Sequence, residues 1–172
     1  MSTQAPEQDE QQDSYLDLSQ LSWLEAVGMV SGLLLFISLF LPWFSTGSNP
    51  DADIATAHIG PNASATAFQT FRIADWLFVL VSIAPFVLTW IIARRHKLDW
   101  PTGEVTMVAG LVGIFLVLCN GVVLGKPKPA IEVSLDIGWF LGLIACCGIF
   151  FAGLMRQQQK TSQRGRKPPG TV

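Results

Sequence analysis

The sequence predicts an all-α fold: a membrane-embedded four-helix bundle with short loops, one longer outer loop and disordered tails. Three observations favour this fold class. Half of the 172 residues are hydrophobic, only 14% are charged, and the mean hydropathy is +0.42. Four apolar runs are each long enough to cross a lipid bilayer, and tryptophans lie near the ends of those runs. A soluble domain of this length needs more charged residues on its surface, so the composition indicates a membrane protein.

The four apolar runs define the expected transmembrane helices. A helix needs about 20 apolar residues to cross a hydrocarbon core of ~30 Å. The runs cover residues 24–44, 73–93, 105–125 and 137–155. They divide the chain into an acidic, mostly disordered tail (1–22), a transmembrane domain (23–156) and a basic disordered tail (157–172). A cleaved signal peptide does not fit, because the residues before the first run are acidic.

Charged residues and proline mark the ends of each run in turn. The first run begins at Glu25 and ends at Leu41-Pro42, because proline cannot continue a helix. The other three begin at an acidic residue and end at a basic one, and these pairs are Asp75 and Arg94, Glu104 and Lys126, and Asp136 and Arg156. Such charges complement the helix dipole, so we interpret the acidic residues as helix caps rather than catalytic groups. Pro85, in the middle of the second run, predicts a kink.

The six tryptophans are predicted to anchor the bundle at the two membrane interfaces. Their amphipathic rings favour the headgroup region, where they form aromatic belts. The expected anchors are Trp23, Trp90 and Trp100 on one side and Trp43, Trp76 and Trp139 on the other.

The distribution of basic residues predicts the orientation of the chain. With four spans, both tails and the loop between the second and third helices share a side. That side carries eight Lys and Arg residues, and the other carries three. By the positive-inside rule we expect a multi-pass protein of the plasma (cell) membrane with both termini cytoplasmic. Five of the eight lie from Arg156 onward. They either bind anionic lipid headgroups or act as a stop-transfer signal.

Small residues at four-residue spacing predict close helix packing within the bundle, or self-association. The candidate packing residues are Gly28 and Gly32, Ala109 and Gly113, Gly121 and Gly125, and Gly138 and Gly142. Asn120 is the most polar residue inside a span. We interpret it as an interhelical hydrogen-bond clamp, with a pore-lining role as the alternative.

The outer loop, residues 45–72, is rich in Gly, Asn, Ser, Ala and Thr and is expected to be mostly irregular. Aromatic residues gather at its ends and at the start of the fourth run. They are Trp43, Phe44, Phe68, Phe71, Trp76 and Trp139. One hypothesis is that they fold the loop back over the mouth of the bundle. The alternative is that each ring anchors separately at the interface.

Three stretches together resemble a family of uncharacterised four-span membrane proteins of actinobacteria and their relatives. They are Phe40-Leu41-Pro42-Trp43-Phe44, Ala67-Phe68-Gln69-Thr70-Phe71-Arg72-Ile73-Ala74-Asp75, and Gly138-Trp139-Phe140-Leu141-Gly142-Leu143. The resemblance covers roughly residues 30–156. It implies the same four-span topology and brings no activity with it.

The sequence contains no motif that predicts an enzyme. It has no Ser-His-Asp set, no His-Glu-x-x-His and no phosphate-binding glycine loop, and we expect no cofactor, metal or nucleic acid. The leading hypothesis is a non-enzymatic structural or accessory component of a membrane assembly, bound to the lipid bilayer and to itself or a larger complex. One alternative is an oligomeric transport or channel subunit with a path lined by Asn120, Ser31, Ser38, Ser82 and Thr89. The other is an envelope sensor that uses the loop 45–72.

Overall fold

The computed structural model describes residues 22–46, 63–71, 73–94, 102–120 and 133–165. This part of the chain is mostly helical, as predicted. Its helices are α1 (Trp23–Ser38), α2 (Ala67–Thr70), α3 (Ala74–Ala93), α4 (Thr102–Leu118) and α5 (Ile137–Gly165). Its strands are β1 (Pro42–Thr46), β2 (Ser64–Thr66) and β3 (Val133–Leu135).

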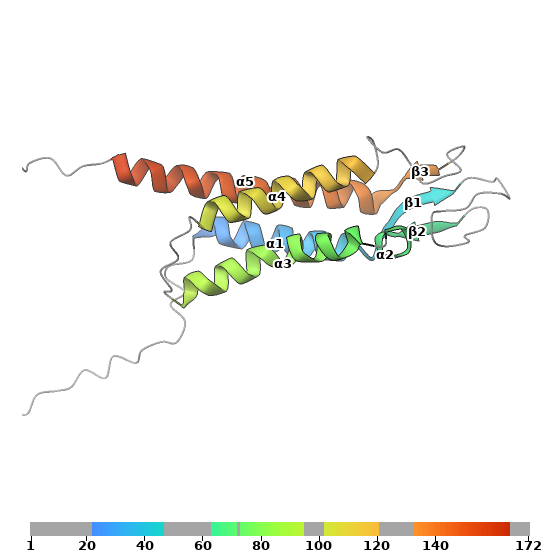
Figure 1. The fold of residues 1–172 in the computed structure, drawn as a ribbon, viewed down its shortest axis with the longest axis horizontal. Coiled ribbons are helices and arrows are strands. Elements are labelled where there is room, and N and C mark those ends of the chain that lie inside the picture. Colours follow the sequence, from blue (N-terminus) through green and yellow to red (C-terminus); the bar gives the residue numbers. More distant parts are fainter. Residues whose placement is uncertain (1–21, 47–62, 72, 95–101, 121–132, 166–172) are drawn as a thin grey trace, which may run out of the picture.

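The four long helices form one elongated bundle in which successive helices run in opposite directions (Figure 1). The start of α1 and the end of α5 lie at the same end of the bundle, which we call the terminal end. The strands and α2 lie at the opposite end, which we call the sheet end. The most extensive helix contact is between α4 and α5, followed by α1 with α5 and α1 with α3.

The sheet at one end of the bundle shows that the all-α prediction is wrong in part. Its strand order is β2-β1-β3, with both pairs antiparallel. Ser45 pairs with Ser64 on one side and with Ser134 on the other, and the Oγ atoms of Ser45 and Ser134 lie 2.7 Å apart. Pro42 ends the helical run, and the following Trp, Phe and Thr favour an extended chain. The first predicted span, 24–44, therefore finishes as a strand.

The boundaries of the other three helices differ from the predicted runs to different degrees. Helix α3 matches the run 73–93 to within one residue. Helix α4 begins three residues before 105, its end is followed by a π-type turn at Cys119 and Asn120, and residues 121–125 lie outside the described residues. Helix α5 continues from the predicted end at 155 to Gly165. The prediction of disorder is therefore wrong for residues 157–165, where Gln, Lys and Arg are good helix formers and no proline interrupts.

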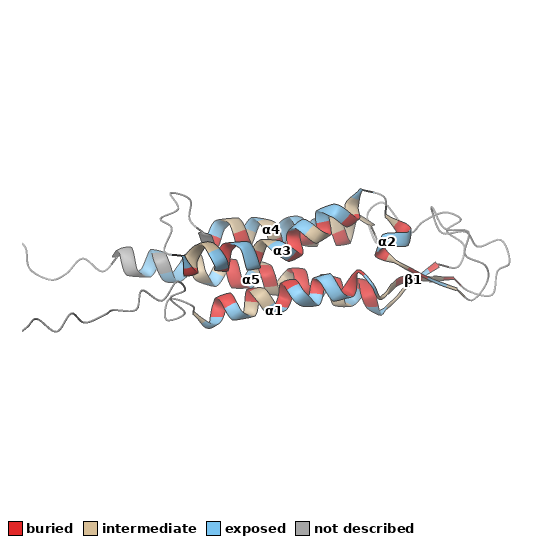
Figure 2. Ribbon diagram, turned by 90° about the horizontal axis from the view of Figure 1, so that it is seen from below, coloured by how far each residue is buried: buried red, intermediate tan, exposed pale blue. Residues whose placement is uncertain are grey.

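Burial follows the bundle geometry, with buried residues on the inward faces and exposed residues on the outward faces (Figure 2). The core includes Leu35, Leu39, Phe78, Val117 and Ile149. Two helical segments, Ala74–Ala93 and Ile137–Gln159, are long and apolar enough to cross a membrane. The other two apolar helices are shorter, Trp23–Ser38 and Gly103–Leu118.

Candidate functional site

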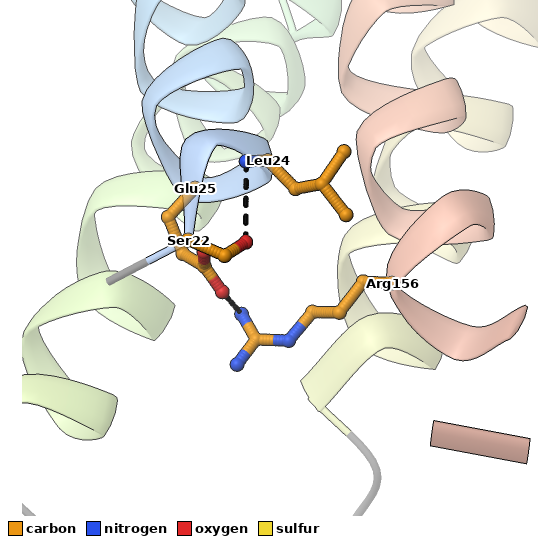
Figure 3. A network of polar contacts seen from close by, with 4 residues as sticks. All are labelled: Ser22, Leu24, Glu25 and Arg156. Carbon is orange, nitrogen blue, oxygen red and sulfur yellow. Dashed lines mark hydrogen bonds and ion pairs between the residues drawn. The ribbon is translucent and has the colours of Figure 1, made fainter. Parts of the chain in front are cut away.

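A buried ion pair joins the first and last long helices at the terminal end. Arg156 Nη1 of α5 contacts Glu25 Oε1 of α1 (Figure 3). The Glu25 side chain is 4% exposed and the Arg156 side chain is 17% exposed. Ser22 caps α1 by accepting a hydrogen bond from Leu24 N–H at 3.2 Å, and this places Glu25 in the first turn. Because α1 and α5 are antiparallel, the first turn of one meets the late part of the other.

A small, partly open cavity adjoins this ion pair and is lined by residues of all four long helices. Its volume is about 20 Å³. It is lined by Leu24, Glu25 and Gly28 of α1, Pro85, Leu88 and Thr89 of α3, Thr106 of α4, and Ala152 and Arg156 of α5. The second carboxylate oxygen, Glu25 Oε2, is buried and has no hydrogen-bond partner among the described residues. The cavity therefore brings opposite charges, hydroxyl groups and free space together.

The cavity lining can bind a small polar molecule. Thr89 and Thr106 are both buried, and a threonine hydroxyl can donate and accept a hydrogen bond. Pro85 has no N–H, so it cannot donate to the carbonyl of Val81 one turn earlier. The described residues include no group of three or more His, Cys, Asp or Glu side chains that could hold a metal ion.

An aromatic cap closes the bundle at the sheet end, formed by Trp43, Phe44, Phe71, Phe78 and Trp139. The Trp43 ring lies 5.6 Å from that of Phe71 and 5.3 Å from that of Phe78, measured between centroids. Trp43 Nε1 donates a hydrogen bond to the Ser38 carbonyl at 2.7 Å, and Trp139 Nε1 donates to the Val117 carbonyl at 3.2 Å. These bonds satisfy two indole N–H groups that would otherwise be buried without a partner.

The aromatic residues that were predicted to fold the outer loop over the bundle fall into two groups. Trp43, Phe44 and Trp139 are buried, and Phe71 packs against them. Phe68 and Trp76 are exposed, and Phe68 contacts Phe40 with ring centroids 5.2 Å apart. The rings close to the bundle axis therefore pack together, while the outer two face away from it. Residues 47–62 of the loop lie outside the described residues.

Five of the predicted packing residues lie at contacts between elements. A β-carbon on Gly32 would lie 2.5 Å from the Ser82 carbonyl oxygen, and one on Gly113 would lie 2.7 Å from Cys146 Sγ. Gly138 and Gly142 face Trp43, and Gly28 faces Pro85 and Ala152 at ordinary contact distance. Ala109 is half-buried on α4. Gly121 and Gly125 lie outside the described residues.

Asn120 and two of the predicted anchors, Trp43 and Trp139, have surroundings that differ from those expected. Asn120 Nδ2 donates to the Leu116 carbonyl at 2.9 Å, which is a bond within one helix rather than the expected bond between helices. Trp23, Trp76 and Trp90 are exposed. Trp43 and Trp139 are buried in the cap, so protein surrounds them in place of the lipid headgroups that an anchor contacts. Trp100 lies outside the described residues.

The sequence interpretation missed two features, each of which leaves a signal. The first is the α4–α5 contact, where small or buried residues recur every seven positions: Gly103, Gly110 and Val117 on α4, and Trp139, Cys146 and Gly153 on α5. A β-carbon on Gly110 would lie 2.6 Å from Phe150 Cα. A seven-residue spacing of this kind does not appear among small residues four positions apart. The second is the Glu25–Arg156 pair, whose opposite charges stand at two helix ends predicted to share a side.

Comparison of the chain with protein-family models and with curated proteins gave no match. The resemblance to four-span actinobacterial proteins therefore stays a prediction. The function has to be inferred from the bundle, the ion pair with its cavity, and the aromatic cap.

Proposed function

We propose that the protein is a multi-pass integral membrane protein that acts as a non-enzymatic structural or accessory component of a membrane assembly. The observation that carries the proposal is the distribution of side chains. Apolar side chains cover the outward faces of all four long helices, while polar side chains are buried between them. In a protein surrounded by water this arrangement would be reversed, since contiguous exposed apolar patches rarely exceed a few hundred Å².

The outward apolar surface extends along each long helix. It includes Val30, Leu33 and Ile37 on α1, Leu80, Ile83 and Val87 on α3, Val108, Leu111 and Phe115 on α4, and Phe140, Ile144 and Phe151 on α5. The buried polar side chains are Glu25, Ser31, Ser38, Asp75, Ser82, Thr89 and Thr106 on the same helices. A lipid bilayer is the environment that stabilises such a surface.

The two shorter helices fit a bilayer when the chain beyond them is included. With 16 residues, α1 is about 24 Å long, less than the ~30 Å of a hydrocarbon core. The apolar run continues through Leu39 and Leu41 into β1. Non-helical backbone is tolerated at that depth only when protein satisfies its hydrogen bonds. Strands β2 and β3 provide those bonds to β1, and the aromatic cap surrounds it.

The buried polar groups support an accessory role over a transport path through one bundle. Ser38 Oγ donates to the Leu35 carbonyl and Ser82 Oγ donates to the Val79 carbonyl, both at 2.7 Å. Asn120, in the turn that follows α4, donates to the Leu116 carbonyl of that helix. These two hydroxyl groups and the amide are hydrogen-bonded to nearby backbone carbonyls, and the rings of the aromatic cap pack together at the sheet end.

The partner of this protein is proposed to bind the outward apolar faces. The predicted small-residue seams that the structure describes pack inside the bundle, so they are not free to bind a second copy. The charge distribution favours cytoplasmic termini, with the basic residues after Arg156 near anionic headgroups.

Membrane topology is tested by inserting a reporter domain into the full-length chain after Ser48 and, separately, after Lys97. We expect the first insertion on the outer side and the second on the cytoplasmic side. Both insertions on one side of the membrane would contradict the four-span proposal.

The accessory role is tested by photo-crosslinking in native membranes. A photoreactive residue at Phe115, Leu80 or Ile144, all exposed, should give a reproducible adduct with a second protein or a second copy, while the same residue at buried Leu35 should not. Recovery of the monomer alone from all three exposed positions would defeat the proposal. In liposomes the purified protein should give no flux above empty vesicles. A flux that Asn120→Leu abolishes would favour the transport alternative.

A further inference from the structure

We propose that the cavity between the four long helices is a binding site for one water molecule, which donates a hydrogen bond to Glu25 Oε2 and keeps the Glu25–Arg156 pair charged inside the bundle. The inference does not rest on the membrane proposal, because it concerns the interior of the bundle whatever surrounds it.

The chemistry of Glu25 calls for a hydrogen-bond donor at this place. Its Oε1 is paired with Arg156, whereas its Oε2 is buried without a partner among the described residues. Buried polar atoms in native proteins are nearly always satisfied by protein or by ordered water, and an unsatisfied carboxylate oxygen is among the most unfavourable exceptions.

The size and lining of the cavity fit water. A cavity needs roughly 10–15 Å³ to hold a water molecule and two to four polar partners to retain it. This cavity has about 20 Å³. Besides Glu25 it is lined by Thr89 and Thr106, and a threonine hydroxyl oxygen can accept the second hydrogen of the water.

The charges around the cavity favour a neutral occupant over an ion. Glu25 and Arg156 together carry no net charge. A cation in this space would lie beside the guanidinium of Arg156, and an anion would lie beside the carboxylate of Glu25. The Arg156 side chain, which lines the cavity at the terminal end, is 17% exposed, so this part of the lining is in contact with the surroundings of the bundle.

Hydroxyl-radical labelling of the full chain in lipid nanodiscs tests the inference, because radicals formed from bound water modify the side chains beside it. Leu88 lines the cavity, and Leu35 lies in the core away from it; they are 7% and 0% exposed. We expect Leu88 to be labelled at least fivefold faster than Leu35. Equal labelling of the two leucines would overturn the proposal.

Two variants separate a bound water from general solvent penetration. Thr89→Val with Thr106→Val removes both cavity hydroxyls with little change in volume, and it should reduce Leu88 labelling severalfold. Thr70→Val, a buried threonine at the sheet end, should leave it unchanged. Unchanged labelling in the double variant would overturn the proposal. In the infrared spectrum at pH 7, Glu25→Gln should remove a carboxylate band; loss of a protonated-carboxyl band instead would show that the pair is not charged.

Discussion

Glu25 and Arg156 hold the first and last long helices together, and their environments differ. Both charges lose hydration when the bundle forms, and their attraction offsets this loss only while both are present. Glu25 is the more deeply buried of the two. The net attraction within the pair therefore adds little to stability. Removing one partner alone, however, leaves the other as an unpaired buried charge.

This asymmetry predicts an order of stabilities for three variants. Arg156→Leu leaves the deeply buried carboxylate unpaired and should lower the free energy of unfolding by about 3 kcal/mol. Glu25→Leu leaves the more exposed guanidinium and should cost less. The double variant should be more stable than Arg156→Leu, because no buried charge remains unpaired. Unfolding in mixed detergent micelles measures all three, and additive losses in the double variant would contradict the prediction.

The glycines predict a second contrast between residues of the same type. A β-carbon on Gly153 would lie 2.8 Å from Met107 Cα, so Gly153→Ala forces α4 and α5 apart and should cost about 1–3 kcal/mol. A β-carbon on Gly28 would lie 3.6 Å from Pro85 Cβ, which is ordinary contact. Gly28→Ala should be neutral or stabilise α1 by up to about 1 kcal/mol. The same unfolding assay measures the stability of both variants. Equal losses of stability would be inconsistent with close packing of α4 against α5 at Gly153.

At the scale of elements, the aromatic cap and the sheet complete the bundle where α1 ends. Strand β1 lies in the middle of the sheet and carries Trp43 and Phe44 into the cap. The cap therefore depends on residues from β1, from α3 and the residue after α2, and from α5. Its rings are core residues, although their positions in the sequence are those of interfacial aromatics.

Quenching of tryptophan fluorescence by brominated lipids should distinguish the two kinds of tryptophan at the sheet end. Trp76 is 69% exposed, and Trp139 is 5% exposed. Trp76→Phe should remove a strongly quenched component of the emission, and Trp139→Phe should remove a component that the lipids barely quench. If the two variants lost equally quenched components, the cap would not be packed in the membrane-embedded protein.

The helices could be predicted from the sequence because run length and charged ends are local properties. The strand at Pro42–Thr46 could not, because a short apolar segment after a proline fits a helix end, a loop or a strand until its pairing partners are known. Helix α5 was predicted too short because hydropathy detects apolar residues, whereas helix formation by the residues from Gln157 onward needs no apolar face.

At the scale of the whole molecule, the candidate site depends on how the helices are rotated about their axes. Its lining comes from four helices, and periodicity within one helix does not say which of its faces meets Glu25. The sequence suggested that Glu25 and Arg156 share a side of the membrane. It could not indicate that they touch, because contact requires α1 and α5 to be neighbours, which the close approaches at Gly142 and Gly148 allow.

The orientation of α1 is predicted to depend on the rest of the bundle. Arg72 is the first basic residue of the chain, so no Lys or Arg flanks α1. A chain truncated after Ser48 and fused to a reporter should insert in both orientations, since the positive-inside rule gives it no direction. The full-length chain with the same reporter after Ser48 should insert in one. Uniform insertion of the truncated chain would show that α1 carries its own orientation signal.

Because β1 is the central strand, its two edges find their partner strands at different times during synthesis. Strand β2 follows β1 closely in the chain, but β3 comes only after α3 and α4. Until residues 133–135 emerge, one edge of β1 has unpaired backbone groups, and such an edge pairs readily with any extended chain. Arrival of β3 closes this edge, and the last helix, which follows directly, then adds Trp139 to the cap. A ribosome stalled before residue 133 would hold a nascent chain with a free strand edge.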